Sequence, residues 1–237
     1  MHRLFISDLH LSEETPEIEA AFKTLLENQD NLDSLVILGD FFEAWVGDDD
    51  DTDFVFRMRA LLASCSERGC ELMIARGNRD FMLGEQFARD TGATLLDDET
   101  VVEVGGEPTL LLHGDTLCTD DVHYQQFRRL VHDAAWQAEM MAKPLDERRT
   151  LARQLRATSI DAASNKAEDI MDVNQDAVRE RLTEMGVRRM IHGHTHRPNR
   201  HAIGNAERIV LGDWTACHGW FLRERDEELS LECFDII

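Results

Sequence analysis

The sequence predicts an α/β fold with a block of helices inserted into it. In the first half of the chain, short apolar runs that indicate buried strands alternate with amphipathic segments that indicate helices. Residues 121–186 contain no convincing strand, and strands return after them. A chain of 237 residues can bury the core of one large domain. We therefore expect a single domain over 1–237, with 121–186 as a helical insert, or cap, within it.

Three strand–helix pairs are predicted before the insert. Each helix places apolar residues three and four positions apart, as Phe54, Met58 and Leu62 do, and Pro16 occupies the first turn of the first helix. A hairpin with Gly105-Gly106 at its turn follows. The expected strands are 4–6, 35–38, 72–74, 101–104, 109–112, 190–191, 208–211, 220–222 and 229–234, and the expected helices before the insert are 16–28, 53–68 and 83–90. The strand–helix–strand order indicates a largely parallel sheet.

The composition argues against several classes of protein. Acidic residues number 47 against 25 basic ones, and the formal charge of −22 would repel the phosphates of a nucleic acid. No apolar run approaches the roughly 18 residues of a membrane-spanning helix, and Asp8 interrupts the first apolar run before a signal core can form. The five cysteines form no Cys-x-x-Cys pair, which favours reduced thiols in a cytoplasmic protein. The acidic run 48–51 is interpreted as a solvated loop rather than an additional metal site.

The insert differs in charge from the rest of the chain. Residues 123–156 hold seven basic and four acidic residues, whereas the remainder holds 18 basic and 43 acidic ones. Basic and apolar residues on helices suit contact with an anionic lipid surface. The alternative, that the apolar residues pack the insert onto the body, stays open. We expect docking on a bilayer to use four arginines of the insert: Arg148, Arg149, Arg153 and Arg156.

Five polar clusters follow predicted strands at their C-terminal ends. Ligands of open α/β sheets gather at this edge, and the glycines in four clusters allow sharp turns and close approach. The clusters should therefore converge on one site. They are Asp8-Leu9-His10, Gly39-Asp40, Gly77-Asn78-Arg79-Asp80, His113-Gly114-Asp115 and Gly193-His194-Thr195-His196.

The side chains of these clusters suit two divalent metals. Oxygen and imidazole donors without thiolate favour Mn²⁺ or Fe²⁺, with Zn²⁺ as an alternative. Two metals about 3.5–4 Å apart would activate a bridging water and stabilise the charge of a phosphoryl displacement. The other histidines are taken as structural, including His192, which would point away from His194. The seven expected ligands are Asp8, His10, Asp40, Asn78, His113, His194 and His196.

The series Asp-x-His, Gly-Asp, Gly-Asn, His-Gly and Gly-His-x-His resembles the calcineurin-like metallophosphoesterases over residues 8–196. The resemblance implies two packed sheets flanked by helices, with two metals at the strand ends. It also implies two ligand sets that share Asp40 as a bridge: Asp8, His10, Asp40 and His196 for one metal, and Asp40, Asn78, His113 and His194 for the other.

Arg79 departs from the commonest pattern of that family. Many members have a histidine here that protonates the leaving group, whereas an arginine stays charged and can clamp phosphate oxygens instead. A phosphate group that leaves from a pyrophosphate has a low pKa and needs no proton. The substitution therefore favours pyrophosphate cleavage over removal of phosphate from serine or threonine.

Four longer motifs resemble one branch of the family, the UDP-2,3-diacylglucosamine hydrolases of lipid A synthesis. They lie at 39–49, 77–81, 113–121 and 170–175. The resemblance implies water attack on the α-phosphorus, giving UMP and 2,3-diacylglucosamine 1-phosphate. It also implies two Mn²⁺ ions and a cytoplasmic protein attached peripherally to the inner membrane, and no obligate protein partner is inferred. The implied substrate-binding residues are Asn78, Arg79, Asp121, Ser159, Lys166 and His194.

One position of that branch is missing, because Ala163 stands where its members have a substrate-contacting asparagine. Two other functions stay open. A pyrophosphatase or phosphodiesterase acting on a soluble nucleotide would have no use for an apolar insert. A scaffold without activity would be expected to have lost metal ligands, yet all seven are present.

Overall fold

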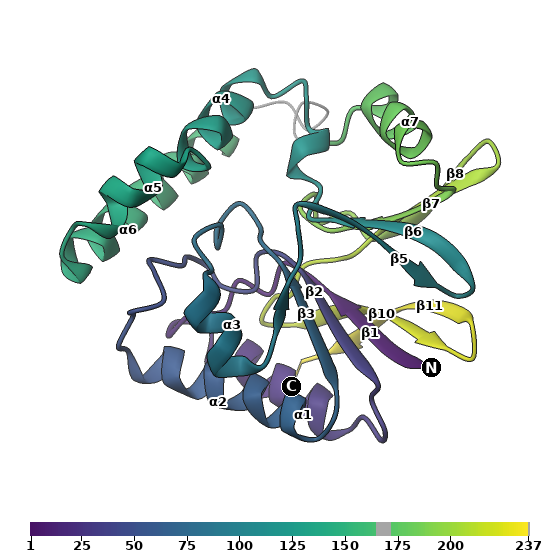
Figure 1. Cartoon of the computed structure of the whole chain (residues 1–237), viewed down its shortest axis with the longest axis horizontal. Helices are drawn as coiled ribbons and strands as arrows, with labels where there is room; N and C mark the ends of the chain where they lie inside the picture. The colour runs from purple at the N-terminus through teal and green to yellow at the C-terminus, as the bar shows by residue number, and fades with distance from the viewer. Residues whose placement is uncertain (165–171, 237) are drawn as a thin grey trace.

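The fold is a sandwich of two mixed β-sheets with helices outside them (Figure 1). This computed structural model describes residues 1–164 and 172–236, with the side chains of the insert described up to Thr158 and again from Asp172. The first sheet has the order β11 (Glu228–Asp235), β10 (His218–Arg225), β1 (His2–Ile6), β2 (Ser34–Leu38), β3 (Glu71–Ala75), β4 (Thr94–Leu95). The second has the order β5 (Glu99–Val104), β6 (Glu107–Leu112), β7 (Arg189–His192), β9 (Ala206–Val210), β8 (Asn199–Ile203).

The expected parallel core is present in both sheets. Strands β1 to β4 run parallel, and β10 and β11 extend that sheet antiparallel. In the second sheet β6, β7 and β9 are parallel, with β5 and β8 antiparallel at the edges. The predicted α/β sandwich is confirmed. The short β4 and the polar edge strand β8 were not predicted, because an edge strand need not be apolar on both faces.

The central strands are buried on both faces. In β1, Phe5 packs between the sheets, whereas Leu4 and Ile6 face the helices α1 (Pro16–Glu27), α2 (Asp53–Glu67) and α3 (Glu85–Thr91). Helix α7 (Gln175–Glu184) covers the outer face of the second sheet through Val178 and Leu182. Burial on both faces explains why these strands appear in the sequence as continuous apolar runs.

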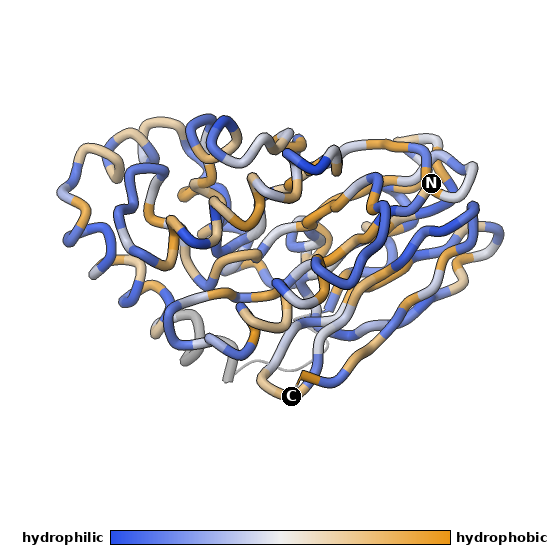
Figure 2. The backbone as a smooth tube through the Cα atoms, turned by 90° about the horizontal axis from the view of Figure 1, so that it is seen from below, coloured by the Kyte–Doolittle hydropathy of each residue, from blue (hydrophilic) through white to orange (hydrophobic). Residues whose placement is uncertain are grey.

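Three helices project from the sandwich and form an arm. They are α4 (Val122–Val131), α5 (Ala134–Met141) and α6 (Leu145–Ser164), which follow β6 and the short 3₁₀ helix η1 (Asp115–Leu117). The arm lies at the left of Figures 1 and 2, and in Figure 2 its backbone alternates between hydrophilic and hydrophobic residues. None of the helices described by the structure is both long enough and apolar enough to cross a membrane.

Two arginines of α6 fasten the arm to the acidic loop (Asp48–Asp51). Arg148 has a side chain that is 3% exposed and donates to the Val46 carbonyl (2.6 Å) and to Asp49 (2.7 Å). Arg149 bonds to the next two carboxylates of the loop at 2.6 and 2.7 Å. The loop is exposed to solvent at Asp49 and Asp51, as expected, and it is also a binding surface for α6. The prediction that these two arginines face a bilayer is corrected, because both are engaged within the protein.

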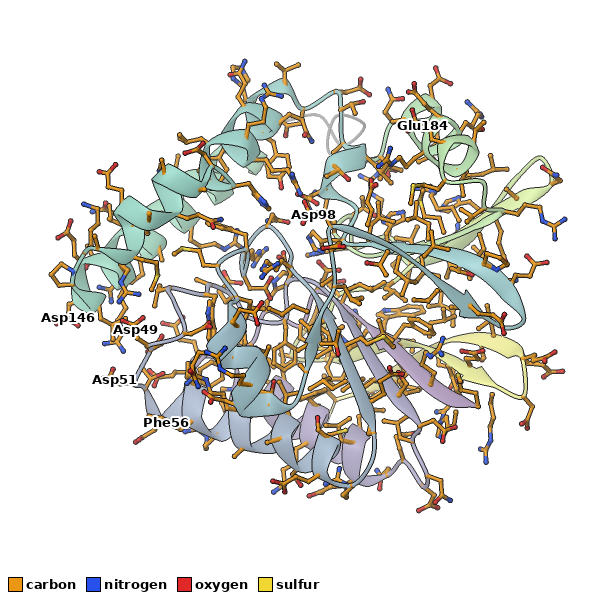
Figure 3. All side chains as sticks on the ribbon, viewed as in Figure 1. Asp49, Asp51, Phe56, Asp98, Asp146 and Glu184 are labelled. Atoms are coloured by element: carbon orange, nitrogen blue, oxygen red, sulfur yellow. The ribbon has the colours of Figure 1, made fainter. Side chains whose placement is uncertain are left out.

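Figure 3 shows this junction in the same view as Figure 1. Asp146, at the start of α6, lies beside Asp49 and Asp51 of the acidic loop, and Arg149 bonds to both Asp146 (3.3 Å) and Asp51. Further along α6, Arg156 forms an ion pair with Glu43. Of the four arginines expected to contact lipid, three thus bind carboxylates of the body.

Candidate metal centre

Five loops meet at one end of the sandwich, each directly after a strand. They follow β1, β2, β3, β6 and β7, as the sequence predicted. Five of the seven expected ligands have a positive φ between 51° and 65°, a conformation that costs energy outside glycine. The loops are thus held in sparsely populated conformations, which is typical of functional sites. These five residues are Asp8, His10, Asp40, His194 and His196.

Two glycines allow the loops to approach closely. A Cβ atom on Gly77 would lie 2.1 Å from Asp40 Oδ1, and one on Gly193 would lie 2.2 Å from Asp8 Oδ2. Any side chain at either position would displace an expected ligand. The predicted role of glycine in close backbone approach is confirmed at these two positions.

The structure brings all seven expected ligands together, and we call this set the strand-end cluster. Its first half contains Asp8, His10 and His196. His196 Nε2 lies 3.4 Å from Asp8 Oδ1 and 3.2 Å from His10 Nε2. One donor atom from each of the three residues lies within 4.8 Å of the other two. Ring nitrogens that face one another in this way suit a shared cation.

The second half contains Asn78, His113 and His194. Asn78 Oδ1 lies 2.9 Å from His113 Nε2 and 2.8 Å from His194 Nδ1. The other ring nitrogen of His113 bonds to the Leu38 carbonyl at 2.8 Å, which directs Nε2 into the cluster.

Asp40 lies between the two halves. Its Oδ1 is 3.7 Å from His113 Nε2, and its Oδ2 is 3.9 Å from His10 Nδ1. One carboxylate oxygen thus faces each half, which is the arrangement that a bridging carboxylate requires. Asp8, Asp40 and His113 also form a compact group of donor atoms, so the halves are continuous.

The donor atoms fit a pair of divalent cations. Asp8 Oδ1 and His10 Nδ1 are buried and have no hydrogen-bond partner. Such orphaned atoms are costly unless another group satisfies them. Both belong to the strand-end cluster, and both face other donors rather than solvent. Oxygen and imidazole donors without thiolate match Mn²⁺, Fe²⁺ or Zn²⁺ chemistry.

The electrostatics of the cluster also call for positive charge. Complete burial raises the pKa of Asp40 to about 7, although the charges of His113 and Arg79 oppose this. Burial lowers the pKa of His113, but Asp40 and Asp8 outweigh it and raise that pKa to about 9. His113 therefore retains a proton at neutral pH, whereas burial lowers the pKa of His194 to about 4, and bound cations would take the place of the retained protons.

Several supporting residues were not predicted as part of the site. His196 Nδ1 lies 3.4 Å from Asp213 Oδ2, which helps to raise the pKa of His196 to about 10 against the effect of burial. Gly212-Asp213 follows the predicted strand 208–211 as Gly39-Asp40 follows the predicted strand 35–38, so the pattern was readable in the sequence.

Asp80 is a scaffold rather than a ligand. It is completely buried, and its two oxygens accept the backbone N–H groups of Gly77 (2.7 Å), Asp40 (3.2 Å) and Phe41 (2.8 Å). It therefore ties the loop after β3 to the loop after β2. His192 also lies apart from the cluster, as expected, with Nδ1 bonded to the Gly193 carbonyl at 2.9 Å.

The expected substrate-binding residues fall into three groups. Asn78 and His194 belong to the cluster, and Arg79 lies at its edge, with Nε 3.4 Å from Asp40 Oδ2 and an ion pair to Glu43. Asp121 is buried and caps α4 by accepting the N–H of Tyr124 at 3.0 Å. The side chain of Ser159 and the whole of Lys166 lie outside the described residues.

Helix α4 is anchored beside the cluster. The buried carboxylate of Asp115 accepts from Tyr124 Oη (2.6 Å) and Arg128 Nε (2.7 Å). The Tyr124 ring lies 5.8 Å from the His194 ring. Nothing in the spacing of the sequence indicates this pair of anchors.

A cavity of about 270 Å³ lies between α5 and the loop before α3. Its lining is mostly apolar. The cavity borders the arm and is lined by Asp48, Met82, Gly84, Gln137, Ala138 and Met141.

Comparisons with known proteins agree with this geometry. The model of the calcineurin-like phosphoesterase family matches residues 1–198. The UDP-2,3-diacylglucosamine hydrolase of Cellvibrio japonicus is 47% identical over 241 residues, which cover 100% of both chains. The protein of the same name from Chromohalobacter salexigens is 45% identical over 96% of this chain and 94% of that one. Among solved structures, an archaeal phosphodiesterase shares the fold, with a TM-score of 0.53 at 13% identity over 99% of both chains.

Proposed function

Because this chain belongs to the calcineurin-like phosphoesterase family and, within it, to the UDP-2,3-diacylglucosamine hydrolases, we propose that it hydrolyses the pyrophosphate bond of UDP-2,3-diacylglucosamine. The products are UMP and 2,3-diacylglucosamine 1-phosphate, an intermediate of lipid A synthesis. The observation that carries the proposal is the convergence of seven oxygen and nitrogen donors at one end of the sandwich.

The strand-end cluster holds two Mn²⁺ ions in this proposal. Asp8, His10 and His196 would hold one ion, Asn78, His113 and His194 would hold the other, and Asp40 would serve both. When bound, such a pair supplies an activated water and positive charge for in-line displacement at phosphorus. Leu38, Asp80 and Asp213 keep the ligand side chains and loops in place.

Arg79 clamps the phosphate in this proposal. Its side chain is 16% exposed at the edge of the cluster and carries a permanent charge. An arginine cannot donate a proton to the leaving group, so the reaction must expel a group that is stable as an anion. The sugar phosphate released from a pyrophosphate meets this requirement, whereas the alkoxide of a simple monoester does not.

The glucosamine and its acyl chains would lie between the cluster and the arm. Asn78, Arg79 and His194 would meet the phosphates, and the apolar cavity beside α5 suits hydrocarbon. For three residues of the insert the proposal rests on the matching motifs alone. These are Asp121, Ser159 and Lys166.

We place the protein in the cytoplasm, attached peripherally to the inner membrane. Since Arg148 and Arg149 bind the acidic loop, the contact with lipid must use other residues. The arm exposes apolar side chains that are 37–58% accessible, with Arg129 and Arg153 also exposed. The exposed apolar residues are Val122, Leu130, Met141 and Leu155.

One assay tests the reaction. Purified protein is incubated with UDP-2,3-diacylglucosamine in ¹⁸O-labelled water, with Mn²⁺ or with a chelator, and UMP is measured. We expect Mn²⁺-dependent UMP release with the label in UMP, because water attacks the α-phosphorus. Label in the lipid phosphate would contradict the site of attack. Turnover of UDP-glucose without turnover of the acylated substrate would instead favour a soluble nucleotide substrate.

A further inference from the structure

Glu43 joins the arm to the strand-end cluster. It lies in the loop after β2, where its backbone N–H donates to the Leu11 carbonyl at 3.0 Å. The preceding Phe42 packs against Trp45, with ring centroids 4.6 Å apart. Both contacts fix the backbone of the loop, so the partly exposed carboxylate of Glu43 projects from a rigid support beside the metal ligands.

The two oxygens of this carboxylate hold two different guanidinium groups. Oε2 accepts from Arg79 Nη1, and Oε1 accepts from Arg156 Nε. The backbone of Arg79 is already fixed, because its N–H donates to Asp40 Oδ1 (2.9 Å) and its carbonyl accepts from Trp45 (3.1 Å). Glu43 and Asp40 are thus the groups that set the direction of the Arg79 side chain.

Arg156 reaches this point from the arm, 113 residues away in the sequence. The carboxylate that it binds lies beside the metal centre. Glu43 Oε2 itself lies 3.8 Å from His10 Nδ1. Without the carboxylate, the two guanidinium groups would repel each other and could not stay side by side.

We propose that Glu43 is a positioning residue that aims Arg79 at the phosphate, and that Arg156 acts through Glu43. The inference rests on the proposed function, in which Arg79 is the clamp. Docking of the arm then does more than enclose the acyl chains. It brings Arg156 to Glu43, which holds the Arg79 guanidinium at the reacting phosphate. The position of Arg79 therefore depends on the arm being in place.

The test is a set of variants of the full-length, Mn²⁺-loaded protein, with kcat, KM, metal content and melting temperature measured for each. Glu43→Gln keeps the shape and removes the charge. We expect kcat/KM to fall about 10-fold to 100-fold, as misplaced catalytic groups do, with metal content unchanged. Glu19→Gln is the matched control, because Glu19 also binds an arginine (Arg57, 2.9 Å) but lies on α1.

The effects of the double variants on kcat/KM distinguish a positioning role of Glu43 from a merely structural one. In an Arg79→Ala background, Glu43→Gln should have little further effect, since the group that it aims is gone. Arg156→Gln should reproduce part of the Glu43→Gln defect and add little to it. Arg156→Lys, which keeps the charge, should recover part of the loss.

Three results would overturn the inference. They are full activity of Glu43→Gln, loss of metal in Glu43→Gln, or a double variant with Arg79→Ala whose loss of kcat/KM equals the product of the two single losses. If Glu43→Gln does not fold, the Arg156→Gln and Arg79→Ala pair applies the same criterion. If the wild type releases no UMP, the proposed function fails instead. The variants are then compared on bis(p-nitrophenyl) phosphate, where the same non-additivity is expected.

Discussion

The strand-end cluster and the arm both gather charged side chains, but they do so in different ways. In the cluster, each ligand lies on a loop that follows a strand of the sandwich, and backbone hydrogen bonds such as that from Asp8 N–H to the Gly39 carbonyl (3.1 Å) hold these loops. In the arm, flexible arginines of α6 reach carboxylates that lie 99 residues away in the sequence. The first arrangement is set by the backbone, and the second by pairs of long side chains. The cluster should therefore be rigid, and the arm should detach more easily.

The arm also explains the unusual charge of the insert. Three of its basic residues, Arg148, Arg149 and Arg156, compensate an acidic face of the body rather than forming a free surface. Gly47 makes this contact feasible, because its φ is +134° and a Cβ there would lie 2.4 Å from Arg148 Nη1. A charge asymmetry between two segments can thus indicate an interface within one chain as well as a partner outside it.

The largest effect is expected within the cluster. Asp40→Ala and His113→Ala should each abolish turnover, because the bridging carboxylate or one ligand of the second half is removed. Metal content should fall while the circular dichroism spectrum stays folded. His201→Gln, on the edge strand β8, is the control and should remain active. Normal turnover in either alanine variant would show that the cluster is not the active site.

A smaller but still strong loss is expected at the edge of the cluster. Arg79→Ala should lower kcat by about 10²–10³-fold, the usual cost of removing a group that stabilises developing charge. Since Arg79 is not among the proposed ligands, both metals should remain, as measured by elemental analysis. Wild-type turnover with full metal content would refute the clamp.

Loosening the arm should have a moderate effect and leave the sandwich intact. Asp49→Asn leaves the buried Arg148 without its charged partner, which should weaken the attachment by about 1–3 kcal/mol. Hydrogen exchange over residues 145–158 should accelerate, while β1 and β2 stay protected. Glu19→Gln again serves as a control on the body. Equal acceleration in the strands would mean that the arm and the sandwich unfold together.

The same junction predicts a dependence on pH. The hydrogen bond from Arg148 lowers the pKa of Asp49 below its ordinary 3.8. The stability that this pair contributes is therefore fully present above pH 3.8 and is lost as the pH falls through the lowered pKa. Exchange in α6 of the wild type, corrected for intrinsic rates, should rise toward that of Asp49→Asn only below pH 3.8. A rise at pH 6 would point to another group.

The smallest effect is expected on membrane contact. Replacing the exposed Arg129 or Arg153 by glutamine should reduce binding to anionic liposomes about fivefold, at about 1 kcal/mol per charge near the surface. Arg149→Gln, which removes an arginine bound to the acidic loop, should change liposome binding little. The opposite ranking in a sedimentation assay would restore the original expectation for Arg149.

The sequence predicted the two regions unequally. Central strands buried on both faces are visible as apolar runs, and a ligand that follows such a strand has a fixed place, so Asp8, Asp40 and His113 could be located without a structure. Asp213 obeyed the same rule and was overlooked. Glu43 and Arg156 could not be paired, because no periodicity relates residues that meet only after the arm has docked.

The most direct test of the central claim is a crystal of the protein grown with Mn²⁺ and measured at the manganese absorption edge. Two anomalous peaks are expected within the strand-end cluster: one beside Asp8, His10 and His196, the other beside Asn78, His113 and His194, with Asp40 touching both. An empty cluster, or manganese bound only at the acidic loop, would contradict the account.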